Sequence, residues 1–410
     1  MQFSDLQLHE TILKALTENK HHTATPVQQK VIPVALNRKD VIVTAQTGTG
    51  KTAAFALPII QSLLKEQDSE KGGKKIKALI VSPTRELAIQ IQESFKAYSK
   101  YTNLRSTAIF GGMSTAPQID VLTKGVDILI ATPGRLIDLH RQGVVELRLL
   151  KTLVLDEADL MLDMGFIEDV KRIEELCPRK KQTLLFSATM PTKIAELAKS
   201  MLYNPEKITI APSGSTSENI GQLLYYVPKR NKTDLCLHLL RNEINGKIII
   251  FRRTKFGVDK LEQTLLKNGY KVTSIHGDKT QAIRNKAIED FKNKKATILI
   301  ATDVAARGID ISKVDAVFNF DLPNIPETYI HRIGRTGRAG KSGIAFSLCS
   351  KDELSYIKTI QETLKRDIKV VEDHPFPLVK PKPKKQPNTV SKHKKSRKSA
   401  NSKKKKKRWY

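Results

Sequence analysis

The sequence predicts an α/β fold with two doubly wound parallel sheets in tandem. Short runs of β-branched and aliphatic residues alternate with longer segments in which apolar residues recur at helical spacing. Short runs that are apolar throughout are typical of parallel strands covered by helices on both faces. The alternation stops at one polar stretch and then begins again, which indicates two similar units. In such sheets we expect ligands beyond the carboxyl ends of the strands.

The predicted strands of the first unit follow a helical region that runs from Phe3 to Leu36. This region is interrupted near Pro26, a residue that suits the first turn of a helix. The first strand is expected at residues 41–44. The other expected strands are 78–81, 127–130, 153–155 and 183–186 in the first unit, and 248–251, 272–275, 297–300 and 316–320 in the second.

The composition changes at two places along the 410 residues, a length that exceeds what one core usually serves. Residues 211–219 are polar and rich in Ser, which is typical of a flexible linker. After about residue 367, Pro, Lys, Ser and Asn dominate, and such a segment buries too little apolar surface to order itself. The predicted organisation is therefore a unit at 1–210, the linker, a unit at 220–366 and a disordered Lys-rich tail at 367–410.

The formal net charge of +29 is concentrated at the C-terminal end. Residues 380–410 carry fifteen Lys and Arg and no Asp or Glu, which leaves +14 for the rest of the chain. A polyanion is the expected partner, and nucleic acid is the commonest one. The Lys-rich end also fits a nuclear-localisation signal or a solvating segment, so its role stays open.

The apolar runs and the cysteine spacing indicate the compartment in which the protein works. No run of eighteen apolar residues is present, and Met1–Asp5 lacks the basic and apolar regions of a signal peptide, so we expect a cytoplasmic protein. Cys177, Cys236 and Cys349 lie far apart without a C-x-x-C pair. This spacing argues against a zinc site or a disulfide framework, and we expect these cysteines to be packing residues.

A glycine loop between a β-branched strand and a helix is the strongest functional pattern. Gly48 and Gly50 let backbone N–H groups turn toward an anion, Lys51 can reach β- and γ-phosphates, and the Thr52 hydroxyl can hold Mg²⁺. Ala45 stands where the strict P-loop pattern has Gly. The predicted nucleotide loop comprises Ala45, Gln46, Thr47, Gly48, Thr49, Gly50, Lys51 and Thr52.

A pair of adjacent carboxylates follows the strand at 153–155. P-loop proteins keep a metal-holding Asp and a water-orienting base at this edge, so we expect Asp156 to hold Mg²⁺ and Glu157 to orient the water. A helix cap followed by a first-turn acid is the alternative, which fits Asp159 as well. The upstream phosphate loop favours the catalytic interpretation.

The tetrapeptide Asp156–Asp159 resembles the motif that names the DEAD-box RNA helicases, and other family motifs follow in order between Phe3 and Arg338. The chain is similar to a bacterial member with a basic C-terminal tail, which implies two RecA-like domains. Thr25, Pro26 and Gln28 resemble the family's Q motif. By this resemblance Gln28 reads the adenine edge and Phe3 stacks on the base. Lys20, His21 and Ala24 stand where the family usually has Gly, an aromatic residue and Pro.

The resemblance also implies RNA contacts at the strand ends of both units. Hydroxyls, glycine amides and arginines in such loops suit phosphate oxygens and 2′-OH groups. Each short motif alone is also common in loops that bind no ligand. The implied RNA-binding residues are Pro83, Thr84, Arg85, Gly112, Thr132, Pro133, Gly134 and Arg135 in the first unit, and Gln281, Arg284, Thr302 and Gly308 in the second.

Three further groups are implied by family likeness. Arg335 and Arg338 are expected to reach the γ-phosphate as arginine fingers, since the planar guanidinium suits bidentate phosphate contact. A solvated basic helix end is the alternative. Asp310 is implied to hold the ribose. Ser187 and Thr189 resemble the motif that couples hydrolysis to strand separation, with hydrogen bonds expected to the Asp156–Asp159 loop, although in isolation they read as a helix cap.

These residues imply an ATP-dependent RNA helicase that uses Mg²⁺. We expect RNA-stimulated ATP hydrolysis and local unwinding or remodelling of RNA duplexes and RNA–protein complexes, with little base reading. Because the phosphate loop and the arginines lie on different units, ATP and RNA should favour the same closed state. The implied settings are ribosome assembly, RNA turnover or cold adaptation, with ribonucleoprotein or RNA-degradation partners through the tail. An ATP-driven DNA translocase and a non-catalytic RNA clamp or annealing protein remain alternatives.

Overall fold

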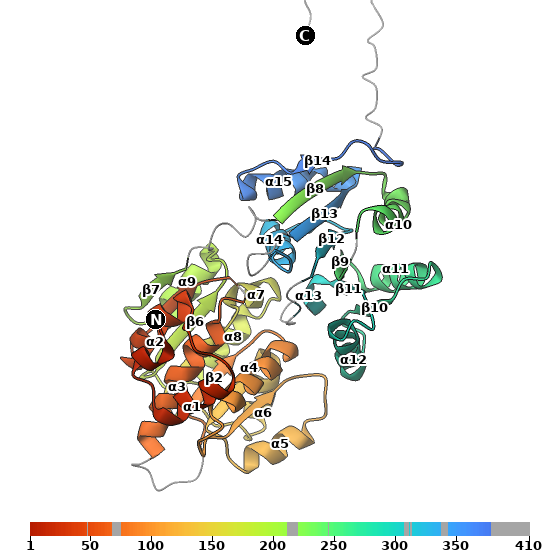
Figure 1. Cartoon of the computed structure of the whole chain (residues 1–410). Coiled ribbons are helices and arrows are strands. Elements are labelled where there is room, and N and C mark those ends of the chain that lie inside the picture. Colours follow the sequence, from red (N-terminus) through yellow and green to blue (C-terminus); the bar gives the residue numbers. More distant parts are fainter. Residues whose placement is uncertain are drawn as a thin grey trace, which may run out of the picture.

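The computed structural model describes residues 1–46, 48–67, 75–210, 220–244, 246–306, 311, 314–337 and 343–378. Two α/β units follow one another along the chain, and each contains a seven-stranded sheet in which the paired strands are parallel (Figure 1). The predicted fold class is thereby confirmed. The expected linker at 211–219 and the tail from residue 379 onward lie outside the described residues.

The sheet of the first unit has the strand order β3-β4-β2-β5-β6-β1-β7. Five of these strands were expected within one residue of their ends. The edge strands β3 and β7 were not, because polar residues interrupt their apolar pattern. The strands are β1 Val41–Thr44, β2 Ala78–Val81, β3 Ser106–Ile109, β4 Ile128–Ala131, β5 Thr152–Leu155, β6 Gln182–Ser187 and β7 Glu206–Thr209.

Several helices of the first unit begin at residues that suit a helix start, such as a Thr before the first turn or a Pro within it. Helix α2 begins at Pro26 as expected, and Oε1 of Gln28 accepts from the N–H of Thr25 at 2.8 Å across its first turn. The helical elements are η1 Phe3–Leu6, α1 Glu10–Glu18, α2 Pro26–Leu36, α3 Lys51–Gln67, α4 Arg85–Tyr98, α5 Ala116–Thr123, α6 Pro133–Arg141, α7 Ala158–Asp163, α8 Ile167–Glu175 and α9 Thr192–Met201.

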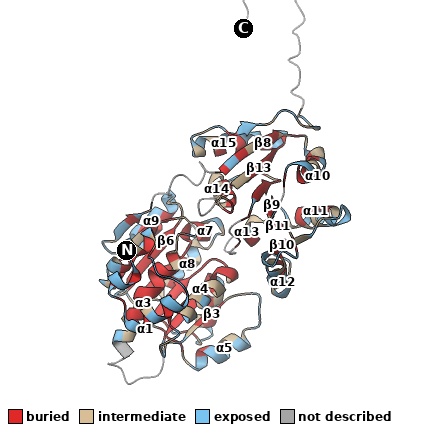
Figure 2. Ribbon diagram, viewed as in Figure 1, coloured by how far each residue is buried: buried red, intermediate tan, exposed pale blue. Residues whose placement is uncertain are grey.

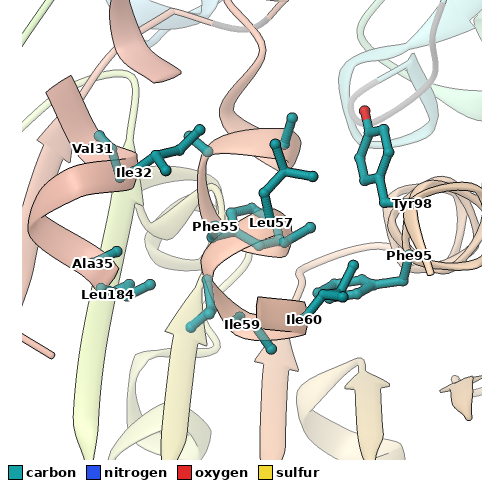
Figure 3. Close-up of a cluster of buried hydrophobic side chains, with 14 of the residues drawn as sticks. Val31, Ile32, Ala35, Phe55, Leu57, Ile59, Ile60, Phe95, Tyr98 and Leu184 are labelled. Carbon is teal, nitrogen blue, oxygen red and sulfur yellow. The ribbon is translucent and has the colours of Figure 1, made fainter. Parts of the chain in front are cut away.

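Two hydrophobic layers cover the first sheet, and the buried residues concentrate on its strands and inward helix faces (Figure 2). In one layer, Phe55 of α3 packs edge-on against Phe186 of β6 with ring centroids 5.2 Å apart. The ring centroid of Phe55 also lies 6.2 Å from that of Phe95 of α4, and Figure 3 shows both residues within this layer. These contacts fix α3 on the sheet. Because α3 begins at Lys51, they also fix the end of the phosphate loop.

The second sheet has the order β10-β11-β9-β12-β13-β8-β14. Strands β9 to β12 were expected, whereas β8 and β13 were missed because a glycine and buried polar residues break their apolar runs. Gln222 of β8 and Ser347 of β13 are such buried polar residues. The strands are β8 Ile220–Tyr226, β9 Ile248–Arg252, β10 Val272–Ile275, β11 Ile298–Thr302, β12 Ala316–Asn319, β13 Gly343–Cys349 and β14 Lys369–Val370.

Helices cover both faces of this sheet as well. The two hydrophobic clusters that they form with the strands are largely separate from each other. The helical elements are η2 Lys229–Asn231, α10 Lys232–Asn242, α11 Lys255–Lys267, α12 Gln281–Lys292, α13 Asp303–Ala306, α14 Pro326–Ile333, η3 Lys351–Glu353 and α15 Leu354–Leu364.

The prediction of disorder from residue 367 onward is wrong for residues 367–378. Strand β14 pairs with β8, Ile368 is buried, and the N–H of Leu378 donates to the carbonyl of Tyr226 at 2.9 Å. Phe376 packs against the apolar cluster of the second unit. The prediction was made from the composition of residues 367–410 as a whole, which the Lys-rich end dominates. The few apolar residues at the start of this segment therefore had little weight in it.

Cys177, Cys236 and Cys349 are free thiols, and the last two are fully buried, as expected for packing residues. In the described residues no helix is both long and apolar enough to cross a membrane.

Candidate functional site

The phosphate loop has the backbone that its glycines predict. Gly48 and Gly50 have φ values of 84° and 93°, in the left-handed region that favours glycine. A Cβ at Gly50 would also lie 2.4 Å from Nε2 of Gln28, so only glycine fits there. Ala45 is not in the left-handed region, which explains why alanine can stand at the start of this loop.

Lys51 is buried at the first turn of α3 and is paired with an acid. Its Nζ lies 2.8 Å from Oε1 of Glu157 and donates to the carbonyl of Ala45 at 3.1 Å. Burial alone would lower the pKa of Lys51, but the charges of Glu157 and Asp156 outweigh it and raise the pKa. The side chain therefore stays cationic.

The two carboxylates after β5 differ in their surroundings. Glu157 has a φ of 56°, a strained conformation for a residue with a side chain, and α7 begins directly after it. Asp156 is buried, and its Oδ1 has no hydrogen-bond partner among the described residues. Burial and the charge of Glu157 raise the pKa of Asp156 to about 7. A carboxylate with these properties has a free oxygen for a cation.

The site fits a magnesium ion that is bound partly by protein oxygens and partly by the phosphates of a nucleotide. Mg²⁺ in such sites takes one or two protein oxygens together with phosphates and waters. The unpartnered oxygen of Asp156 and the hydroxyl of Thr52 are the candidate ligands. Within the described ranges no cluster of three or more His, Cys, Asp or Glu side chains could hold a metal ion.

A hollow of about 600 Å³ lies beside the phosphate loop. Gln28 connects the two, because its Nε2 donates to the carbonyl of Gly50 at 3.1 Å while its Oε1 accepts from the N–H of Thr25 at 2.8 Å. The implied base-stacking residue Phe3 also lies there, with its N–H donating to the carbonyl of His22. The lining residues include Phe3, His21, His22, Gln28, Gly50, Thr52, Ser94 and Tyr98.

The three departures from the family's Q motif keep the local turn. Lys20 has a φ of 58°, which explains why glycine is usual at that position. The N–H of Ala24 donates to the carbonyl of Met1 at 3.2 Å, a bond that proline could not make. The ring of His21 lies 6.0 Å from that of Tyr98, so an aromatic contact is retained.

The hydrogen bonds expected between the Ser-Ala-Thr motif and the carboxylate loop are present. Oγ of Ser187 accepts from the N–H of Asp159 at 3.1 Å, and the N–H and Oγ1 of Thr189 donate to Oδ2 of Asp159 at 2.9 and 3.0 Å. Burial would raise the pKa of Asp159, but the charges of His331 and Lys51 and the bonds from Thr189 lower it. Ser187 and Thr189 thus bind Asp159 to the end of β6 and the segment that follows it.

The predicted RNA-side residues of the first unit gather at the ends of β2, β3 and β4. The Thr84 hydroxyl caps α4, and Arg85 is the first residue of that helix. The Arg85 guanidinium lies directly against Gly112, where a Cβ would overlap it. Nη2 of Arg135 donates to the carbonyl of Met113 at 3.0 Å, and its buried Nη1 has no partner among the described residues. Pro83, Thr132, Pro133 and Gly134 belong to the same loops and helix starts.

Two of the predicted RNA-binding residues of the second unit, Gln281 and Arg284, contact the first unit directly. Nη2 of Arg284 lies 2.8 Å from Oε1 of Glu86, and Nε2 of Gln281 donates to the same oxygen at 3.2 Å. Glu86 follows Arg85 on α4 and is 7% exposed. Its role was not expected from the sequence, because Glu86 is an acid within a motif that is predicted to contact RNA and nothing near it indicates a partner.

The remaining predicted residues of the second unit are described in part. Arg335 is buried and lines a small hollow with His331 and Asp303. Thr302 ends β11, directly before Asp303. The predicted residues Thr47, Gly308, Asp310 and Arg338 lie outside the described residues.

Two family models match the chain. The DEAD/DEAH box helicase model matches residues 25–197, and the helicase conserved C-terminal domain matches residues 231–340. The DEAD-box ATP-dependent RNA helicase RhpA of Helicobacter pylori is 44% identical over 370 residues, which cover 90% of this chain and 74% of RhpA. The DEAD-box ATP-dependent RNA helicase CshA of Bacillus subtilis is 43% identical over 364 residues, covering 89% of this chain and 72% of CshA.

Solved structures show the same two-unit architecture. Dbp5 of S. cerevisiae bound to RNA and ADP BeF3 is 32% identical with a TM-score of 0.79, covering 90% of this chain and 95% of that one. Mss116 bound to ssRNA and AMP-PNP is also 32% identical, with a TM-score of 0.81 and coverage of 90% and 79%. Because these matches extend across both units, the chain belongs to the family of DEAD-box ATP-dependent RNA helicases.

Proposed function

We propose that residues from both units form one composite ATPase site, which is completed when the units close on RNA. The contact of Glu86 with Arg284 and Gln281 is the observation that supports this proposal most directly. It joins the RNA-side helix α4 of the first unit to the RNA-side helix α12 of the second. ATP and RNA would therefore stabilise the same closed arrangement, and each should strengthen the binding of the other.

We infer the following roles in hydrolysis. The oxygen of a water molecule forms a bond to the γ-phosphorus while the bond from this phosphorus to the bridging oxygen of ADP breaks. Glu157 orients the water and accepts its proton. Lys51 offsets the negative charge of the β- and γ-phosphates, and Arg335 and Arg338 stabilise the charge that develops in the transition state.

The nucleotide would be held by groups from three segments. Phe3 and Gln28 would bind the adenine, the loop from Ala45 to Thr52 would bind the phosphates, and Asp310 would hold the ribose. Thr52 and Asp156 would hold Mg²⁺, in part through water, which neutralises phosphate charge when it is bound. The unpartnered Oδ1 of Asp156 supports this assignment.

The proposed RNA site reads backbone and not base sequence. Its members are arginines, hydroxyls, glycine amides and helix starts, which suit phosphates and 2′-OH groups of single strands and short duplexes. Arg85 beside Gly112 and the unpartnered Nη1 of Arg135 support such a site. Ser187 and Thr189 would couple hydrolysis to strand separation through Asp159.

A defined ATPase assay tests this proposal. ATP turnover should rise on addition of single-stranded RNA, and an otherwise identical DNA strand should not reproduce the effect. Stimulation by DNA would favour an ATP-driven DNA translocase. RNA binding that persists at full strength with no turnover in the unmodified protein would favour a clamp or annealing protein. A Lys51→Ala variant with undiminished turnover would contradict the assigned site.

The cellular setting is proposed on likeness alone. Ribosome assembly, RNA turnover and cold adaptation in the cytoplasm are the settings that the bacterial type implies, with ribonucleoprotein or RNA-degradation partners through the basic tail. Crosslinking RNA to the protein in cells and sequencing it would distinguish these settings. Recovery of ribosomal precursor RNA would favour assembly, and recovery of messenger RNA would favour turnover.

A further inference from the structure

Arg332 of α14 lies at one end of a chain of buried hydrogen bonds in the second unit. Its Nε and Nη2 donate to the two carboxylate oxygens of Asp303 at 2.6 and 2.7 Å, and its Nη1 donates to the carbonyl of Asp321 at 2.6 Å. Nη1 also donates to Oδ1 of Asn319 at 3.2 Å. These bonds fix the guanidinium relative to α13 on one side and β12 on the other.

The chain continues from Asn319 across two neighbouring strands. Nδ2 of Asn319 donates to Oγ of Ser347 at 3.2 Å, Ser347 donates to the hydroxyl of Tyr329 at 3.4 Å, and this hydroxyl donates to Oε1 of Gln222 at 3.0 Å. The five residues from Arg332 to Gln222 are at most 7% exposed, and we call them the Arg332–Gln222 chain. Each group accepts from the Arg332 side and donates toward Gln222, so the guanidinium charge polarises all the bonds in one direction.

Stability alone does not account for this chain. Nε2 of Gln222 is buried and has no hydrogen-bond partner among the described residues. A buried polar network that is only partly satisfied is commonly no more stable than apolar side chains of similar volume. The surrounding positions of the sheet are apolar, and Phe318 and Phe346 are examples. Apolar side chains could therefore also fill the positions of the Arg332–Gln222 chain.

We infer that the hydroxyl of Tyr329 is a positioning group for ATP hydrolysis and acts through the Arg332–Gln222 chain on Arg332. Arg332 lines one small hollow together with His331, Arg335 and Asp303. A change in the orientation of Arg332 would therefore shift Arg335, which is proposed above to stabilise charge at the γ-phosphate. The inference rests on the composite ATPase site proposed above.

The variant Tyr329→Phe tests this role because it removes one hydroxyl and keeps the buried ring. Burial raises the pKa of Tyr329 to about 12, so the hydroxyl is a donor at neutral pH. We expect kcat of the RNA-stimulated ATPase to fall about three- to tenfold, the range that corresponds to one net hydrogen bond. KM for ATP should change by less than about twofold, because no group that contacts the nucleotide is lost.

Tyr225→Phe is the matched control in the same unit. Tyr225 of β8 is equally buried, and its hydroxyl donates to Oε2 of Glu243 at 3.1 Å, outside the Arg332–Gln222 chain. We expect both variants to lower the melting temperature by similar amounts, but only Tyr329→Phe to lower kcat. Equal kcat in the two variants would overturn the inference.

Ser347→Ala interrupts the chain one bond closer to Arg332 and provides an independent test. It should lower kcat by a similar factor, and the double variant Y329F/S347A should be no slower than the slower single variant. Losses that multiply would overturn the inference. An unmodified protein without RNA-stimulated turnover would refute the proposed function, whereas normal kcat in both Y329F and S347A would refute only the positioning role.

Discussion

Lys51 and Glu157 form a buried ion pair, with Nζ of the lysine 2.8 Å from Oε1 of the acid. The cation proposed to contact the phosphates is thus bound to the carboxylate proposed to orient the water. ATP phosphates would compete with Glu157 for Lys51, because both are anionic ligands for the same ammonium group. In this arrangement, binding of ATP would release Glu157 toward the attacking water.

Replacement of Glu157 by Gln should separate ATP binding from hydrolysis. The amide keeps the shape of the side chain but loses the charge that holds Lys51, so nucleotide affinity should be unchanged or higher. The hydrolysis rate should fall by about 10² to 10⁴, the range for loss of a general base. Binding of a fluorescent ATP analogue and single-turnover hydrolysis measure the two quantities.

The matched control for this prediction is Glu174→Gln. Glu174 pairs with Lys181, a well-buried lysine of the same unit, at 2.9 Å and away from the phosphate loop. This variant should keep both affinity and turnover. A Glu157→Gln protein that loses ATP binding together with turnover would contradict the assigned role of Glu157.

The contact of Glu86 with Arg284 predicts a defect in the response to RNA. Glu86→Gln leaves Arg284 without its carboxylate partner and weakens the closed arrangement of the units. We expect the RNA concentration for half-maximal ATPase stimulation to rise roughly tenfold, as for loss of a coupled pair. Glu93→Gln on an exposed turn of the same helix α4 is the control and should show no change.

A double variant shows whether the effect of Glu86 depends on Arg284. The protein E86Q/R284Q should require no more RNA than R284Q alone, because the contact is already lost in the single variant. If the two losses multiplied instead, Glu86 would act independently of Arg284, and the proposed junction between α4 and α12 would be wrong.

The three cysteines should be unreactive in the folded protein. Burial raises the pKa of Cys177, Cys236 and Cys349 to about 12, so at pH 8 only about one thiol in 10⁴ is ionised at each site. Iodoacetamide should therefore not modify the native protein, and all three thiols should react in urea. Mass spectrometry of the two samples distinguishes the outcomes, and rapid native modification of Cys236 would contradict its burial.

The sequence predicted those parts of the molecule that a pattern of consecutive residues defines. Strands such as β2, β5 and β9 are apolar throughout because helices bury both of their faces, and their runs are visible in the sequence. The phosphate loop and the carboxylates after β5 are contiguous motifs. Strands β8 and β13 were missed because buried polar residues such as Gln222 and Ser347 break the apolar pattern.

The contact of Glu86 with helix α12 could not be predicted from the sequence. Gln281 and Glu86 are 195 positions apart, and no local pattern pairs an acid of one unit with an amide of the other. The same holds for the charge of His331 on Asp159, which depends on how the two units face each other. Folding therefore provides the contacts between units that the proposed composite site requires, whereas the sequence motifs provide only its parts.

Removal of residues 380–410 should weaken RNA binding in a salt-dependent way. The deletion takes away fifteen positive charges, and each lost phosphate contact reduces the slope of log K against log salt by about 0.7 for a single strand. Fluorescence anisotropy with single-stranded RNA between about 50 and about 200 mM salt measures that slope.

A full-length variant with these fifteen residues changed to Gln separates the effect of charge from the effect of tail length. Its salt slope should match that of the deletion, because counterion release depends on charge alone. If the deletion instead kept the full slope, the tail would not be the RNA anchor. A targeting or solvating role would then account for its lysines.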